Sequence, residues 1–219
     1  MKYSVSKENY LKAIFHLQQE QESVSTNALA EALQTKPASV TDMLKKLKTQ
    51  KLLQYEKYRG VKLTADGKKV AIQIIRKHRM WEYFLVEKLQ FGWEEVHEIA
   101  EELEHISSKK LIDRLEIFLD FPQSEPHGDP IPDATGKFSV QKSIALSSAK
   151  QKNSLIITGV SDHSSEFLKY LSNSGIALGD NLKIEESNGY DKSLKIKVNN
   201  KHSLFLSHKA ASNILVESK

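Results

Sequence analysis

The chain has 219 residues, 39% of them hydrophobic and 27% charged, which suits a folded protein of two or three small domains. It contains no cysteine, which excludes disulfides and thiolate metal ligands, and its net charge of +4 permits nucleic-acid binding without establishing it. No apolar run approaches the ~18 residues that a membrane span needs, and no apolar leader-like segment opens the chain, so we expect a cytoplasmic protein with no membrane partner.

The first segment predicts three helices and a hairpin. Apolar residues recur at helical spacing in the helices and alternate in the strands. The predicted elements are a helix opening near Ser6, helices over 27–33 and from Pro37 to Gln50, and strands near 52–57 and 61–63. This order is typical of a winged helix-turn-helix, and a small helical domain that merely carries a hairpin is the alternative.

The third predicted helix would be the recognition helix of such a domain. Side chains of its first turns would read base edges, and basic residues there and at the hairpin tip would hold phosphates. The candidate base readers are Lys36, Ala38, Ser39, Thr41 and Asp42. The candidate phosphate contacts are Lys45, Lys57 and Arg59, for which an ordinary solvated face is the alternative reading.

Three further helices are expected over 66–90, about 94–107 and 109–119. They present more apolar surface than one small domain can bury, which favours a homodimer. Four of the five prolines then fall within 120–137, the composition of a linker.

The segment after the linker predicts short strands and turns, which together suggest a small antiparallel barrel of SH3-like size. The expected elements are strands at 154–160, 181–187, 193–199 and 202–207, a helix at 164–175 and a short element at 209–214. The predicted fold is therefore mainly α with a C-terminal β domain. The expected divisions are a winged-helix domain at 1–68, a helical domain at 69–121, a linker at 122–140 and the barrel at 141–219.

Imidazoles and carboxylates recur at helical spacing on two of these helices. The set comprises His78, Glu82, His97, Glu101, Glu104 and His105. Residues four apart share a helix face about 6 Å apart, so the two sets can enclose a divalent metal such as manganese, iron or zinc. A solvated acidic face is the alternative for each set alone. We expect His127 to be structural or exposed, whereas the His163 and Glu166 pair could lend ligands from the barrel.

The chain resembles the DtxR/MntR family of metal-dependent repressors over its whole length. The resemblance rests on IRKHRMWEYFL (75–85), EVHEIAEELEHISSKKLIDRL (95–115), SEPHGDPIP (124–132) and YEKYRGVKLTADGKK (55–69). The C-terminal segment resembles the SH3-like, FeoA-like domain of the longer members. The resemblance implies a winged helix, a helical metal-binding and dimerisation domain, and that final domain.

The resemblance also implies two metal sites. The primary site would comprise Glu101, Glu104, His105 and a first-helix ligand, either Asn9 at the matching position or its neighbour Glu8. A carboxylate at position 101 is the manganese-type choice, and Lys12 replaces a glutamate of the binuclear short regulators. The ancillary site would comprise His78, Glu82 and His97, joined by His163 and Glu166 from the barrel.

These observations predict a homodimeric repressor that binds a palindromic operator when manganese is plentiful. The resemblance implies that the repressed targets are metal-uptake genes. Iron(II) sensing is the alternative within the family, and zinc or other divalent metals could substitute in vitro. Outside the family, Glu102 and His105 fit half of the pattern of a helical di-iron carboxylate enzyme. The second half of that pattern is missing from residues 70–90, so we expect no enzyme.

Overall fold

The computed structural model describes residues 3–56, 59–140, 142–150 and 154–218. They form two compact units, each built from segments that are distant in the sequence. Unit 1 comprises residues 1–78, 101–118 and 132–138, and unit 2 comprises residues 79–100, 119–131 and 139–219. The long helix α4, Ala65–Leu89, continues without a break across the division.

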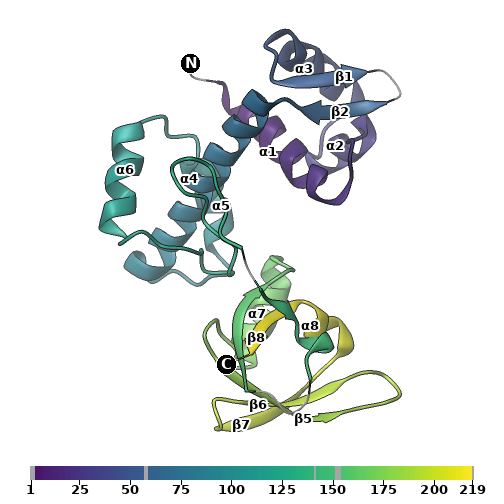
Figure 1. Cartoon of the computed structure of the whole chain (residues 1–219), viewed down its shortest axis with the longest axis vertical. Coiled ribbons are helices and arrows are strands. Elements are labelled where there is room, and N and C mark those ends of the chain that lie inside the picture. The colour runs from purple at the N-terminus through teal and green to yellow at the C-terminus, as the bar shows by residue number, and fades with distance from the viewer. Residues whose placement is uncertain (1–2, 57–58, 141, 151–153, 219) are drawn as a thin grey trace. The chain divides into compact units, whose positions relative to one another are not determined.

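Unit 1 opens with the expected winged helix-turn-helix (Figure 1). Its elements are α1 (Val5–Glu20), α2 (Thr26–Ala32), α3 (Pro37–Thr49), β1 (Leu53–Glu56) and β2 (Gly60–Leu63). The two strands pair antiparallel, with Leu53 opposite Leu63. Gly60 has a φ of +85°, and a Cβ there would lie 2.5 Å from Ser23 Oγ, so the hairpin requires glycine at this position.

Capping and burial explain why these helices form. The Ser25 hydroxyl accepts a hydrogen bond from Ala28 N at the start of α2, and Pro37 occupies the first turn of α3. Leu11 and Ile14 of α1 are fully buried in one core with residues of the other helices and the hairpin. The apolar members of that core are Tyr10, Leu11, Ile14, Val24, Leu29, Ala30, Val40, Leu44, Leu47, Leu52, Leu53, Val61, Leu63 and Ala71.

Two shorter helices follow α4. They are α5, Val96–Leu103, and α6, Lys109–Phe118. The expected helix over 94–107 is too long at both ends, because Glu104 and His105 lie in a turn where Ile106 N donates to Leu103 O. Side-chain bonds of these two residues to Lys12 and Glu8 of α1 hold the chain in that turn.

The C-terminal part of unit 2 is a six-stranded antiparallel sheet in the order β3-β8-β4-β5-β6-β7. Its elements are β3 (Ile144–Ala145), the 3-10 turn η1 (Leu146–Ser148), β4 (Leu155–Val160), α7 (Ser165–Asn173), β5 (Asn181–Ser187), β6 (Leu194–Val198), β7 (His202–Leu206), α8 (His208–Ser212) and β8 (Ile214–Ser218). This sheet confirms the expected SH3-like domain, and its core includes Leu155, Leu171 and Ile196.

Two strands of this sheet are missing from the sequence prediction, β3 and β8. The element expected over 209–214 is instead α8 followed by the start of β8. Pairing explains both omissions, because β3 has only two residues and is bonded to β8, while β8 lies between β3 and β4. Such long-range partners leave little local pattern in the sequence.

The proline-rich segment is ordered against α4 and the sheet within unit 2. Arg79 donates to Pro130 O at 2.7 Å and pairs with Asp129. His127 O accepts from Val160 N at 2.9 Å. Gly128 has a φ of +95°, and a Cβ there would lie 2.1 Å from Thr158 O, so only glycine allows this approach to β4.

Within the part of the chain that the structure describes, no helix combines the length and apolar character needed to cross a membrane.

Candidate metal centre and nucleic-acid interface

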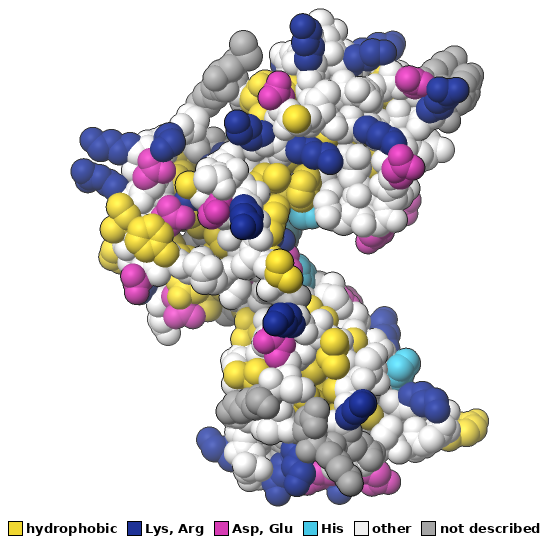
Figure 2. Space-filling view, viewed as in Figure 1, with side chains coloured by type: hydrophobic (Ala, Val, Ile, Leu, Met, Phe, Trp, Pro, Cys, Tyr) yellow, Lys and Arg dark blue, Asp and Glu magenta, His cyan; other side chains and the backbone are white. Residues whose placement is uncertain are grey.

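The first turns of α3 present the predicted base-reading side chains to solvent. Lys36, Ala38, Ser39 and Asp42 are exposed, and Thr41 is half-buried with its hydroxyl bonded to Pro37 O. These side chains can therefore be reached by a base edge without rearrangement of the core. Several Lys and Arg side chains are scattered over the visible face of this domain (Figure 2).

The predicted phosphate contacts are exposed and only loosely paired. Lys45 Nζ lies 3.6 Å from Asp42, and Arg59 lies 3.2 Å from Glu56, with all four side chains more than 60% exposed. Such surface ion pairs stabilise the fold by little, so both cations are available to phosphates. Lys57 lies outside the described residues.

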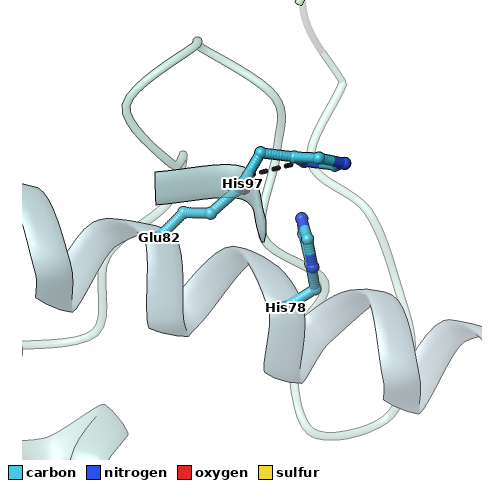
Figure 3. Close-up of side chains that lie close together, drawn as sticks. All are labelled: His78, Glu82 and His97. Atoms are coloured by element: carbon cyan, nitrogen blue, oxygen red, sulfur yellow. Dashed lines mark hydrogen bonds and ion pairs between the residues drawn. The ribbon is translucent and has the colours of Figure 1, made fainter. Parts of the chain in front are cut away.

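The candidate ancillary residues His78, Glu82 and His97 lie close together. One ligand atom from each of His78, Glu82 and His97 lies within 4.8 Å of the other two (Figure 3). His78 and Glu82 are buried one turn apart on α4, and His97 comes from the first turn of α5. Glu82 Oε1 is 3.3 Å from His97 Nδ1. A buried carboxylate between two imidazoles is a donor set that divalent transition metals accept.

A second group shares Glu82 and was not predicted from the sequence. Glu82, Glu125 and His127 are all buried, and one ligand atom from each lies within 4.8 Å of the others. His127, expected to be structural or exposed, is buried, with only 2% of its surface exposed. The signal available in the sequence is the Glu-Pro-His spacing of residues 125–127 inside a segment otherwise read as a linker.

Hydrogen bonds keep the His127 ring charged. Nδ1 is 2.7 Å from Glu125 Oε2, and Nε2 is 2.8 Å from Trp93 O, so each ring nitrogen faces an acceptor. Burial alone lowers the pKa of His127, but the hydrogen bond and charge of Glu125, the charge of Glu82 and the Trp93 carbonyl outweigh it. The pKa rises to about 9.

The predicted primary ligands come from the end of α5 and the turn after it, all within unit 1. Glu104 is fully buried, and His105 Nε2 lies 3.5 Å from its Oε1. Burial raises the pKa of Glu104, yet hydrogen bonds and charges from His78 and Lys12 lower it overall, so the carboxylate is ionised. Among the described residues, Glu101, Glu104 and His105 do not meet within 4.8 Å as a group of three.

The first helix supplies two candidate ligands, which lie in different environments. Glu8 Oε2 is 2.6 Å from His105 Nδ1, a direct link between α1 and the turn after α5. Asn9 makes no such contact, but its Oδ1 is buried and has no hydrogen-bond partner among the described residues. Asn9 also lines a groove whose other walls include Ser39 and Asp42 of the recognition helix.

The two predicted barrel ligands do not join these groups in the described residues. His163 stacks on His127 with ring centroids 5.1 Å apart, and its Nε2 is 3.1 Å from Val160 O. Glu166 lines a separate groove with Asp162 and Lys209. His163 therefore lies beside the second ligand group, whereas Glu166 faces another part of the domain.

The donor chemistry fits a divalent metal. The buried Asn9 Oδ1 has no hydrogen-bond partner among the described residues, and an unpaired buried oxygen is costly unless a cation or donor meets it. Carboxylate, amide and imidazole together suit manganese or ferrous iron, and the chain has no thiolate to favour softer metals.

Three family models match the chain in succession. Residues 2–61 match the DNA-binding domain of the iron-dependent repressors, and residues 64–133 match their metal-binding and dimerisation domain. Residues 144–218 match the FeoA domain.

Known proteins agree with these matches. The chain is 38% identical over 110 residues to the transcriptional regulator MntR of Oceanobacillus iheyensis, an alignment covering 50% of this chain and 74% of the relative. The chain belongs to the DtxR/MntR family of metal-dependent repressors. The iron-dependent repressor IdeR of Mycobacterium leprae is 34% identical over 125 residues, which cover 57% of this chain and about half, 54%, of IdeR.

A solved structure of a manganese-dependent transcriptional repressor in complex with manganese has the same architecture throughout. It superposes with a TM-score of 0.83 at 32% identity, covering 97% of this chain and 100% of the other. The DtxR/MntR family consists of DNA-binding transcriptional regulators and not of enzymes. Membership therefore removes the di-iron carboxylate alternative.

Proposed function

We propose that this chain is a manganese-responsive repressor of metal-uptake genes that acts in the cytoplasm as a homodimer on a palindromic operator. The manganese-type relatives, the exposed recognition helix and the oxygen- and nitrogen-only donor set support this function. The apolar side chains left exposed at the end of α6, Ile117 and Phe118, support the dimer, and Figure 2 shows hydrophobic atoms gathered over that helix.

The observation that carries the proposal is the double attachment of α1. Its buried face, with Leu11 and Ile14, packs in the same core as Val40 and Leu44 of the recognition helix. Another part of the same helix reaches the primary ligands, since Glu8 bonds to His105. A change at the ligands therefore moves α1 and the recognition helix as one packed body.

The primary site would be held by Glu101, Glu104 and His105 together with Asn9 or Glu8. These donors come from α1, the end of α5 and the turn after it, and a metal bound there would supply the positive charge that offsets their carboxylates. The ancillary site would be held by His78, Glu82 and His97, with Glu125 and His127 beside them. Contributions from His163 and Glu166 stay a prediction. We also keep as a proposal the domain boundaries after residues 68, 121 and 140.

In a dimer, fixing α1 would fix the separation of two recognition helices. Half-sites one turn apart, roughly 34 Å, could then be read together. The metal favours this state only by binding it more tightly than the DNA-incompetent state, a coupling of about 1–3 kcal/mol.

An operator-binding assay tests the proposal. The full chain is titrated onto operator fragments with manganese, iron(II), zinc or chelator, alongside a variant carrying Glu101→Ala and His105→Ala. We expect manganese to raise DNA affinity about 5- to 150-fold and the variant to lose that response. Equal affinity with manganese and with chelator would overturn the metal switch, and an unchanged response in the variant would place the sensor elsewhere.

Iron(II) sensing is the second candidate, and the identity to IdeR favours it. The same titration separates the two, because the physiological metal is the one that restores DNA binding near its concentration in the cell. Ligand type alone cannot decide this, since manganese and iron(II) accept the same donors.

A further inference from the structure

The ammonium group of Lys12 lies between the two carboxylates of the primary site. Lys12 Nζ is 3.2 Å from Glu101 Oε1 and 2.8 Å from Glu104 Oε1. It also donates to Glu104 Oε2 at 2.9 Å. The Lys12 side chain is 14% exposed and that of Glu104 is 0% exposed, so this contact is largely screened from water.

A lysine with so little exposed surface requires a partner of opposite charge, because lysine is rarely buried unless it is paired. Here it compensates two carboxylates, one of which is fully buried and would otherwise carry an uncompensated charge. Lys12 lies on α1 one turn after Glu8, the residue whose carboxylate bonds to His105. A single helix therefore brings both a candidate ligand and a cation to the same site.

We propose that Lys12 is a tethered cation that competes with the metal for Glu101 and Glu104. Resting on the proposed function, this assigns Lys12 two effects: it stabilises the metal-free fold, and it raises the metal concentration at which the site fills. A metal that takes the carboxylate oxygens must displace the ammonium, whose flexible four-carbon stem allows it to move to solvent.

Charge alone decides whether removal of Lys12 strengthens or weakens metal binding. Without Lys12, the carboxylates of the metal-free site repel one another and attract a divalent cation more strongly. Opposite charges a few ångströms apart in a partly buried site attract each other strongly, although solvent and relaxation reduce the attraction. We therefore expect removal of the charge to tighten metal binding by about tenfold to a hundredfold. The metal-free melting temperature should fall by about 5 °C.

The test compares full-length variants stripped of metal by chelator. Lys12→Met replaces the charged side chain by an apolar one, and Lys12→Gln replaces it by a neutral polar one. Lys12→Arg retains the positive charge. Lys62→Met is the matched control, because Lys62 pairs with Glu22 in the same unit but away from the site. Calorimetric titration gives the manganese dissociation constant, and thermal unfolding in chelator gives the stability of the metal-free fold.

The expected result is tighter manganese binding and a lower metal-free melting temperature in Lys12→Met and Lys12→Gln. Lys12→Arg and Lys62→Met should bind manganese as the unmodified chain does. Unchanged or weaker manganese binding in both neutral variants overturns the proposal, and so does tightening of the same size in Lys62→Met. If Lys12→Met does not fold, Lys12→Gln decides.

These outcomes are distinct from failure of the proposed function. If manganese strengthens operator binding but the neutral Lys12 variants bind manganese no more tightly, the repressor stands and the role of Lys12 falls. If the unmodified chain binds no manganese while the neutral variants do, Lys12 competes as proposed, but the manganese switch fails. If none of the proteins binds manganese, both fail.

Discussion

His78 Nδ1 lies 2.7 Å from Glu104 Oε2, so an imidazole assigned to the ancillary site is bonded to a carboxylate assigned to the primary site. The two candidate metal sites that the sequence separates are therefore joined by a hydrogen bond between buried side chains. Ionisation of Glu104 depends on His78 as well as on Lys12. A change at either site will thus be felt at the other.

Glu104→Gln should destabilise the metal-free chain more than Glu101→Gln. Glu104 is fully buried and bonded to His78 and Lys12, whereas the Glu101 side chain is 50% exposed. We expect a loss of about 1–3 kcal/mol in the free energy of unfolding for Glu104→Gln and less than about 0.5 kcal/mol for Glu101→Gln. Urea denaturation in chelator measures both, and equal losses would contradict the role assigned to burial.

Lowering the pH should remove the contribution of the Glu104 carboxylate to the stability of the chain. The pKa of Glu104 is lower in the folded chain than the ordinary value of 4.5, so its contribution to stability is present above that value and is lost as the pH falls through the folded pKa. The unmodified chain should therefore lose more unfolding free energy below about pH 4.5 than Glu104→Gln does. Denaturation curves at several acidic pH values check this, and parallel pH profiles would contradict it.

The raised pKa of His127 predicts a loss of stability at high pH rather than at low pH. Its folded pKa of about 9 exceeds the ordinary 6.5, so its stabilisation is full below pH 6.5 and is lost as the pH rises from about 6.5 to about 9. We expect the unmodified chain to lose on the order of 1–3 kcal/mol over this window, and His127→Gln to lose less. Thermal unfolding in chelator at stepped pH measures the loss, and matching slopes in both proteins would show that Glu125 does not hold a charged ring.

Lys45→Ala and Asp42→Ala should affect DNA binding in different ways. Loss of a phosphate contact weakens binding to all sequences and lowers the slope of log affinity against log salt by about 1 per subunit. Loss of a base reader costs about 1–3 kcal/mol on the operator and relaxes preference at one position. Fluorescence anisotropy on operator and scrambled duplexes at several salt concentrations distinguishes the two. An unchanged salt slope in Lys45→Ala would leave Lys45 as a solvated side chain.

Phe118→Lys should separate the dimer. Phe118 is 62% exposed at the end of α6, and a charge there would have to be buried against the second subunit. Sedimentation equilibrium should show mainly monomer for this variant at concentrations where the unmodified chain is dimeric. Phe205→Lys is the matched control, because Phe205 is 66% exposed in the C-terminal domain. Dissociation by Phe205→Lys instead would move the interface to that domain.

Most of the helices follow from the sequence because their pattern is local. Apolar periodicity marks the long helix from Ala65 to Leu89 and the helices before it. Ser25 and Pro37 mark helix starts, and Gly60 marks the turn of the hairpin. The ancillary set is equally local, since His78 and Glu82 share one helix face and only His97 has to be brought from the next helix. Helical spacing predicts that His78 and Glu82 lie on one face, and the fold adds His97.

Tertiary structure decided what depends on distant partners. Strand β8 exists because β3 and β4 flank it, and His127 is buried because Glu125, Trp93 and Val160 surround a segment whose prolines indicate only a linker. The sequence shows Lys12 as one lysine among many. Only folding brings it between Glu101 and Glu104, about 90 residues away, where burial turns an ordinary surface charge into a counterion for two carboxylates of the candidate metal site.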